Sequence, residues 1–216
     1  MYRSRIPSFA KIFLPQIICR IPQPHLWREG DDKKVVYLTF DDGPTPETTP
    51  YIIDILKKYG VKATFFCVGE NVKKYPELYK HIIEEGHFTG NHTFHHLKGW
   101  KTPLNTYMED VKHCAEYVSS NLFRPPYGKM TFRQYNSLKK NFKLIFWDVL
   151  APDFDNNTSV EECLDIVKKK TRAGSILVFH DNLKAKNKLT GLLTGTLDFL
   201  FQEKFDVQPV TNNISK

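Results

Sequence analysis

The sequence has no pair of cysteines spaced as a metal-binding or redox motif. Its four cysteines, Cys19, Cys67, Cys114 and Cys163, lie far apart along the chain. Isolated cysteines in a chain of this size are more often buried apolar side chains than metal ligands or disulfide partners. A disulfide framework and a thiolate metal site are therefore not expected, and free thiols fit a reducing compartment.

The sequence also lacks a long apolar run. Residues 6–20 follow two arginines, as the core of a secretion signal does, but Pro7, Lys11 and Pro15 interrupt them. Such a segment is a poor signal core and is too short to span a membrane. We therefore expect residues 1–33 to be an amphipathic lead-in that packs on the domain. No transmembrane segment is expected, and a cytoplasmic and an envelope-associated location both stay open.

Signatures of nucleic-acid binding are missing as well, although the formal net charge is +7. There is no zinc-finger spacing, no RNA-recognition signature and no alternation of aromatic and basic residues. The lysines are scattered, and their densest clusters, at 139–140 and 168–170, fit exposed helix faces. The charge predicts a solubilising surface, and no nucleic-acid partner is expected.

Repeats, low-complexity tracts and linkers are absent, which indicates one domain over residues 34–216. The 216 residues are 41% hydrophobic and 25% charged, which is typical of a globular protein that buries a full core. From residue 34 onward, short β-rich runs alternate with helical segments, and this favours a parallel α/β architecture. The predicted strands are Val35–Phe40, Ala63–Val68, His87–Gly90, Leu122–Arg124, Leu144–Val149, Ser175–Phe179 and Phe205–Val210.

Helix boundaries carry recognisable signals. Thr49 and Pro50 predict an N-cap with a first-turn proline, and Gly60 predicts the end of that helix. Ser159 and Glu162 predict a capping box. A further helix is predicted after residue 103 by apolar residues at helical spacing, which we expect to be core. They are Leu104, Tyr107, Met108, Val111, Ala115 and Val118.

Two adjacent carboxylates follow the first predicted strand. Asp41 and Asp42 end that strand, and Gly43 and Pro44 then turn the chain. Neighbouring residues on an extended chain point in different directions, so one carboxylate can reach a metal while the other addresses a substrate. An ordinary Asp-Gly turn would explain Asp42 and Gly43 equally well.

Three histidines follow the third predicted strand. His92 and His96 are four residues apart, so one helical turn would place both rings on the same face. A carboxylate with two histidines leaves coordination positions on a divalent metal open for water. His95 points away from that face and is left unassigned.

Three later segments, residues 124–128, 147–154 and 177–181, also carry groups that can do chemistry, and the second offers a large aromatic and two acids. Prolines make residues 124–128 rigid, so this segment can aim the backbone N–H of Tyr127 at a developing oxyanion. A polyproline-like loop without a catalytic role would explain the same residues. Arg124 can pair with a carboxylate such as Asp41. His180 ends an apolar strand, a natural place for a general acid. Nearly all these groups follow the carboxyl ends of predicted strands, where β/α barrels build active sites, so we favour a barrel over an open sheet.

Taken in order, these segments resemble the polysaccharide deacetylase family, which shares its domain with the rhizobial chitooligosaccharide deacetylase. The resemblance covers about residues 34–210. It implies a single-domain α/β fold, a distorted (β/α)7 barrel. It also implies removal of N-acetyl groups from an N-acetylglucosamine-type polysaccharide, such as peptidoglycan or chitin-like oligomers, with release of acetate.

The resemblance implies a role for each matching residue. A divalent metal is expected, with Zn²⁺ first and Co²⁺, Ni²⁺ and Mn²⁺ able to occupy similar nitrogen and oxygen sites. The implied roles are Asp41 as general base; Asp42, His92 and His96 as metal ligands; Arg124 as the partner of Asp41; Tyr127 as the backbone N–H donor; Trp147 and Leu177 as the walls of the acetyl pocket; and His180 as the general acid, oriented by Asp153 or Asp148.

One segment departs from the family pattern. Many relatives have Asp where Leu150 stands and Trp where Phe154 stands. Two alternative functions stay open: a related metal-dependent amidohydrolase acting on another N-acyl group or a cyclic imide, and a catalytically inactive homologue that binds carbohydrate. After the histidines, Trp100 either stacks on a sugar or packs on the barrel.

Overall fold

The computed structural model describes residues 25–26 and 34–211. Apart from 25–26, the predicted lead-in over residues 1–33 lies outside the described residues, and so does Cys19. In the part of the chain that the structure describes, no helix is long and apolar enough to cross a membrane. The described cysteines are buried free thiols, namely Cys67, Cys114 and Cys163.

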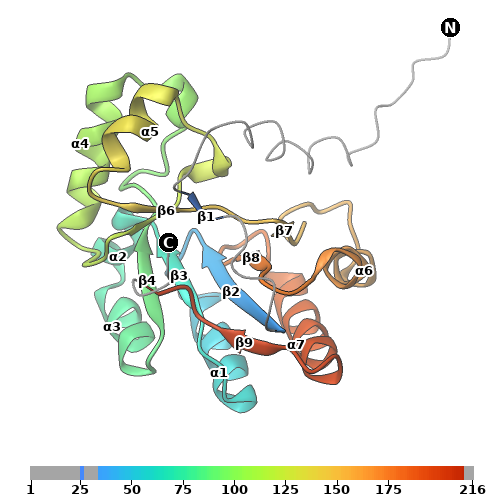
Figure 1. The fold of residues 1–216 in the computed structure, drawn as a ribbon. Coiled ribbons are helices and arrows are strands. Elements are labelled where there is room, and N and C mark those ends of the chain that lie inside the picture. Colours follow the sequence, from blue (N-terminus) through green and yellow to red (C-terminus); the bar gives the residue numbers. More distant parts are fainter. Residues whose placement is uncertain (1–24, 27–33, 212–216) are drawn as a thin grey trace, which may run out of the picture.

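Within the described residues, nine parallel strands form one curled sheet (Figure 1). The strand order is β1-β6-β5-β4-β3-β2-β8-β7, and β9 pairs with β2. β1 falls within the predicted lead-in and pairs with β6. The strands are β1 (His25–Leu26), β2 (Val35–Asp41), β3 (Thr64–Cys67), β4 (Phe88–Asn91), β5 (Leu122–Phe123), β6 (Lys143–Ile145), β7 (Val149–Leu150), β8 (Ile176–His180) and β9 (Asp206–Gln208).

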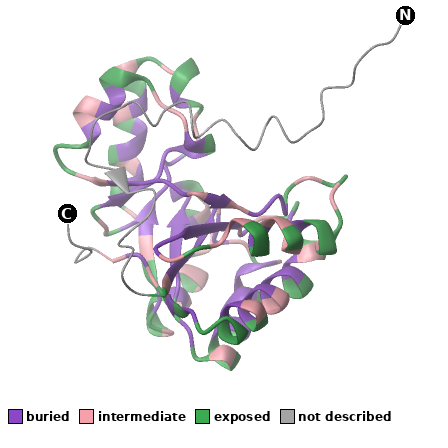
Figure 2. Ribbon diagram, turned by 45° about the vertical axis from the view of Figure 1, so that its right-hand side comes forward, coloured by how far each residue is buried: buried purple, intermediate pink, exposed green. Residues whose placement is uncertain are grey.

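Helices surround this sheet, with their exposed faces turned outward (Figures 1 and 2). The arrangement confirms the predicted α/β class and the distorted (β/α)7 barrel. The α-helices are α1 (Thr49–Tyr59), α2 (Gly69–Lys74), α3 (Pro76–Glu84), α4 (Leu104–Ala115), α5 (Phe132–Leu138), α6 (Val160–Lys170) and α7 (Lys186–Gln202); two short 3₁₀ helices are η3 (Gly99–Lys101) and η4 (Pro126–Gly128).

Side chains of β2 and β8 alternate between two cores. Leu38, Phe40 and Phe179 belong to the large core that the sheet shares with the helices. Tyr37 and Val178 belong to a second core built mainly from strand residues, inside the curl of the sheet. Because strand side chains alternate with a period of two, the position of a residue in β2 or β8 decides whether it faces the helices or the barrel interior.

The predicted strand at 144–149 forms two strands instead of one. β6 ends at Ile145 and β7 begins at Val149, and the two lie towards opposite ends of the strand order. Between them, Arg124 donates from Nε to the carbonyl of Ile145 at 3.3 Å and from Nη2 to the carbonyl of Phe146 at 3.2 Å. A side chain thus takes acceptors that a continuous strand would offer to a neighbouring strand.

The N-cap of α1 differs from the prediction by one residue, while its C-terminal end is as predicted. The N-cap position is Thr48, one residue before the predicted Thr49, and Pro50 lies in the first turn. The hydroxyl of Thr49 donates instead to Asp181. Gly60 ends the helix with a φ of 66°, as predicted for a residue that adopts the left-handed conformation.

The capping box predicted for α6 is confirmed, whereas the buried face of α4 differs from the predicted one. The capping box of α6 is present, with Ser159 and Glu162 each accepting the backbone N–H of the other. In α4 the buried face is rotated from the predicted stripe, because Asp110 and Cys114 are buried while Ala115 is exposed. Asp110 is drawn inward by backbone N–H groups of the loop after β4, which donate to its carboxylate.

Candidate active site

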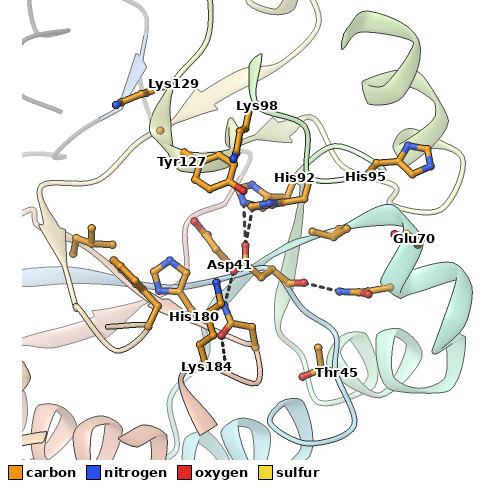
Figure 3. Close-up of a pocket in the computed structure, with 18 of the residues that line it drawn as sticks. Asp41, Thr45, Glu70, His92, His95, Lys98, Tyr127, Lys129, His180 and Lys184 are labelled. Carbon is orange, nitrogen blue, oxygen red and sulfur yellow. Dashed lines mark hydrogen bonds and ion pairs between the residues drawn. The ribbon is translucent and has the colours of Figure 1, made fainter. Parts of the chain in front are cut away.

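One cavity of about 840 Å³ gathers most of the predicted site residues (Figure 3). It opens beyond the carboxyl ends of β2, β4 and β8. Arg124 and Asp153 are fully buried and do not line it, but each contacts a residue that does. The predicted site residues that line the cavity are Asp41, Asp42, His92, His96, Tyr127, Trp147 and His180.

Asp42, His92 and His96 have the spacing of metal ligands. Their ligand atoms lie within 4.8 Å of one another. Oδ1 of Asp42 is 3.1 Å from Nε2 of His96 and 3.5 Å from Nε2 of His92. Two ligands that are each about 2.1 Å from one ion, at a tetrahedral angle, lie about 3.4 Å apart. The three side chains therefore fit one shared divalent ion.

The two histidines of this cluster converge through a loop. Residues 92–98 form no helix, so the prediction of a shared helical face is wrong. Thr93 and His96 adopt left-handed φ angles of 63° and 53°. Asn91 Oδ1 accepts the N–H of Thr93, and Thr93 Oγ1 accepts the N–H of Leu97. These hydrogen bonds hold backbone conformations that non-glycine residues seldom adopt and that cluster at functional sites.

Neighbouring groups orient the ligand atoms. Nδ1 of His92 donates to the carbonyl of Arg124 at 2.7 Å, so Nε2 is the nitrogen that faces Asp42. Asn182 Nδ2 donates to Oδ2 of Asp42 at 2.6 Å. Burial raises the pKa of Asp42, but hydrogen bonds from His92 and His96 outweigh it and hold this pKa well below its ordinary value. The carboxylate stays charged, which is the form that binds a cation.

Asp41 is held by a buried guanidinium. Nη1 of Arg124 donates to Oδ1 of Asp41 at 2.6 Å and to Oγ1 of Thr39 at 2.8 Å. The guanidinium lies 4.0 Å from the ring centroid of Phe66. Burial lowers the pKa of Arg124, and the charge of Asp41 opposes that fall. Removing either member would leave a buried charge without its partner, so the pair fixes Asp41 at the cavity floor.

His180 lies beside Asp41 and is held by Asp153. Asp41 and His180 are register partners on β2 and β8. Nδ1 and the backbone N–H of His180 both donate to Asp153 at 2.7 Å. Burial lowers the pKa of His180, but the charge and hydrogen bond of Asp153 outweigh it and raise the pKa to about 9. Asp148, the other candidate partner, instead accepts hydrogen bonds at the start of β8.

Tyr127 and Trp147 form one side of the cavity. Tyr127 adopts a φ of 61°, and its ring centroid lies 4.8 Å from that of His96. Trp100 meets Tyr127 edge-on at 5.5 Å. Gly128 packs directly on Trp147, because a Cβ added at Gly128 would lie 2.6 Å from Cη2 of that indole. The tight turn therefore seats the indole against the cavity.

Leu177 does not line the cavity, so the prediction that it shapes the acetyl pocket is wrong. It is fully buried in the core shared with the helices. Leu177 is three residues before His180 on β8, so the two side chains point to opposite faces of the sheet. Val178 is two residues before His180 and packs with Trp147 in the inner core.

Three polar residues that contact the site were missed in the sequence. Asn182 binds Asp42, Asp181 lies under the turn after β2, and Asp110 accepts from Nδ1 of His95 at 2.5 Å. The only sequence signal for the first two was their position directly after His180. Asp110 offered no signal, because it lies in the middle of a helix.

The geometry combines two proton-transfer groups with a cation site. A carboxylate and an imidazole are register neighbours, and three ligand atoms converge in the same cavity. Such a set can take a proton from water, stabilise a developing oxyanion and protonate a leaving group, which together constitute metal-assisted hydrolysis.

Comparisons with known proteins agree with this chemistry. Residues 28–142 match the family described as polysaccharide deacetylase. A peptidoglycan-N-acetylglucosamine deacetylase of Bacillus cereus is 30% identical over 186 residues, covering 83% of this chain and 87% of that protein. A chitooligosaccharide deacetylase of Rhizobium leguminosarum bv. trifolii is 31% identical over 184 residues, covering 79% and 84%. A solved peptidoglycan N-acetylglucosamine deacetylase has a TM-score of 0.80 at 29% identity, covering 86% of this chain and 90% of its own.

Proposed function

Because the chain belongs to the polysaccharide deacetylase family, we propose that it removes N-acetyl groups from N-acetylglucosamine-type polysaccharide, releasing acetate. Peptidoglycan and chitin-like oligomers are the proposed substrates. The observation that carries the proposal is a single cavity that joins a three-ligand cluster to Asp41 and His180. We propose a divalent ion at this cluster, with Zn²⁺ first and Co²⁺, Ni²⁺ or Mn²⁺ as alternatives for the same ligand types.

Asp41 is the proposed general base. Arg124 binds its Oδ1, and among the described residues no group donates a hydrogen bond to Oδ2, so that oxygen can take a proton from the attacking water. A divalent ion held by Asp42, His92 and His96 would supply the positive charge that acidifies water and polarises the acetamide carbonyl. The fixed pair with Arg124 keeps the base in one orientation while the proton moves.

His180 is the proposed general acid. With its pKa raised to about 9, it carries a proton at neutral pH. Asp153 binds Nδ1, so Nε2 is the nitrogen free to protonate the departing sugar amine. We propose that the backbone N–H of Tyr127 stabilises the oxyanion and that Trp147 packs against the acetyl methyl group.

The test is acetate release from chitin oligomers and peptidoglycan fragments, measured on purified protein whose metal content is known. We expect release to stop after chelation and to return when one divalent ion is added back. Asp41→Asn should lower kcat by about 10²–10⁴-fold while its metal content stays that of the wild type, because an amide can bind Arg124 but cannot accept the proton. Asp165→Asn, at an exposed ion pair with Lys169, is the control and should keep full activity.

Three results would contradict the proposal. Full metal-dependent activity in Asp41→Asn would remove Asp41 as the base. Release of formate from N-formyl glycans, or opening of cyclic imides, with no acetate from any N-acetylated glycan would favour the related amidohydrolase. Absence of all three activities with every tested metal would favour a homologue that only binds carbohydrate.

A further inference from the structure

Asp181 is a fully buried carboxylate that the proposed reaction does not use. It directly follows His180 at the end of β8. Its Oδ1 accepts from the hydroxyl of Thr48 and its Oδ2 from the hydroxyl of Thr49, each at 2.6 Å. Its backbone N–H donates to the carbonyl of Asp41 at 2.7 Å. Asp181 therefore binds both ends of the segment that runs from β2 into α1.

The hydrogen bonds of the threonine hydroxyls in this segment lead to Asp181. Thr48 has one hydroxyl proton, and because it goes to Asp181, the hydroxyl of Thr45 must be the donor in its 2.5 Å contact with Thr48. The backbone N–H of Thr45 donates to Oγ1 of Thr49 at 2.6 Å. Thr45 lines the cavity (Figure 3), so the network reaches from the buried carboxylate to the site.

The carboxylate also packs against the turn after the two acidic residues. A Cβ added at Gly43 would lie 1.9 Å from Oδ2 of Asp181, so Asp181 occupies the space that a side chain at 43 would need. The preceding residue, Asp42, has a φ of 82°. A non-glycine residue keeps such a conformation only when its surroundings hold it.

We infer that Asp181 is a positioning residue, which holds the turn after β2 so that Asp41 faces the substrate and Asp42 faces the metal. The inference rests on the proposed function for the roles of Asp41 and Asp42. Burial raises the pKa of Asp181 to about 7, and the hydrogen bonds from Thr48 and Thr49 oppose that rise. The two hydroxyls thus favour the charged, acceptor-only form that the network requires.

The test is Asp181→Asn, which keeps the shape of the side chain but replaces one acceptor by a donor. That Nδ2 group would face a hydroxyl that also donates, so one threonine hydroxyl must reverse its direction or lose its bond, and the network is disturbed on that side. Binding of Co²⁺ is measured through its visible absorption, without substrate, and kcat and KM are measured on a chitin oligomer. We expect Co²⁺ binding to weaken by about 10–100-fold with an altered spectrum, kcat to fall by a similar factor, and KM to change by less than about twofold.

Two further variants separate positioning from stability. Asp148→Asn changes another carboxylate that accepts a hydroxyl, that of Ser175, at the opposite end of β8 and away from the cavity. It should lower the unfolding temperature but keep the Co²⁺ affinity and kcat of the wild type. Thr48→Val removes one donor and leaves Asp181 in place, so it serves if Asp181→Asn does not fold. We expect it to change Co²⁺ affinity and kcat in the same direction by about 3–10-fold.

One result would overturn the inference. If Asp181→Asn, or Thr48→Val in its place, binds Co²⁺ with the affinity and spectrum of the wild type and keeps its kcat, then Asp181 serves only the stability of the fold. If the variants weaken Co²⁺ binding while the wild type releases no acetate from any glycan, the positioning of the ligand stands and the proposed function fails.

Discussion

Arg124 and Asp153 act on the two side chains that we propose to move protons. Each is fully buried, and each makes a hydrogen bond of 2.6–2.7 Å to its partner, Asp41 or His180. Without such a partner, the carboxylate of Asp41 or the imidazole of His180 would sample several rotamers in the cavity. At the scale of single residues, the site therefore depends on pairs, in which a buried partner fixes the direction and charge of the residue that we propose to react.

Replacing Asp153 should change the pH profile of the enzyme. His180 has its pKa raised to about 9, so it is protonated at neutral pH and loses its proton only as the pH rises through that value. In Asp153→Asn the raising charge is lost while burial still lowers the pKa. The alkaline limb of kcat should therefore move to lower pH by about one unit or more, and kcat should fall by at least about tenfold. The measurement is kcat for acetate release between pH 6 and 10.

The exposed Asp165 provides the control for this profile, because its replacement by Asn removes one carboxylate at a surface ion pair. In Asp165→Asn, the alkaline limb of kcat should lie at the same pH as in the wild type. An unchanged limb in Asp153→Asn would mean that His180 is not the group whose deprotonation limits the reaction.

That Asp42, His92 and His96 come together could be predicted from sequence, but the geometry that brings them together could not. His92 and His96 stood out because closely spaced histidines after a strand are rare without a metal. Their spacing suggested a helix, whereas left-handed angles in a loop bring them together. The partners of Asn182 and Asp181 lie about 140 residues earlier in the chain, and no local pattern links such distant positions.

At the scale of elements, the short turn η4 seats the indole of Trp147. Gly128 has a φ of 65°, and its missing side chain leaves room for the indole. Gly60, at the end of α1, has nearly the same φ of 66°, but an added Cβ there would meet nothing within 4 Å. The two glycines therefore share a left-handed backbone conformation, but only Gly128 is packed closely against another side chain. Gly60 can thus serve as the control for Gly128.

Replacing each glycine by alanine should separate these two effects. Gly60→Ala should cost about 1 kcal/mol of unfolding free energy, from the left-handed conformation alone, with no change in kcat. Gly128→Ala should cost on the order of 2–4 kcal/mol, because the overlap with Trp147 adds to that strain, and it should also lower kcat. Urea unfolding and acetate release measure the two quantities. Equal losses of stability in both variants would show that the indole is not held by the close contact.

Element boundaries could be predicted where local chemistry decides them. The capping box at Ser159 and the glycine end at Gly60 are set by residues within one turn, so the sequence is sufficient. The break between β6 and β7 is different, since it depends on the side chain of Arg124 binding the carbonyls that follow β6. The face of Leu177 was misjudged because strand periodicity shows which residues share a face but not which face is the interior.

At the scale of the whole molecule, one buried histidine makes the free energy of unfolding depend on pH below neutrality. His87 is buried, and its Nδ1 accepts the N–H of Ala63 at 3.2 Å. Burial, together with the charge of the nearby Lys62, lowers the pKa of His87 from 6.5 to about 4. As pH falls, the unfolded chain takes up this proton before the folded protein does, so stability is lost between about pH 6.5 and 4.

Replacing His87 should reduce this acid sensitivity. The wild type should lose on the order of 2 kcal/mol of unfolding free energy from this group between pH 7 and 5. In His87→Asn the amide oxygen can still accept from Ala63, and no proton is taken up, so the loss over the same range should be smaller by about that amount. Urea unfolding at both pH values gives the comparison. An equal loss in both proteins would place the acid sensitivity elsewhere.

The barrel wall is open at one place, because among the described strands no backbone pairing joins β6 to β7. Arg124 links the end of β6 to β2, with Nε and Nη2 on the carbonyls of Ile145 and Phe146 and Nη1 on Asp41. The link between β6 and β2 and the orientation of the Asp41 carboxylate thus depend on the same side chain. A molecule in which β6 has not docked would leave Arg124 without two of its acceptors, so we expect incompletely assembled molecules to hold Asp41 less firmly and to turn over more slowly.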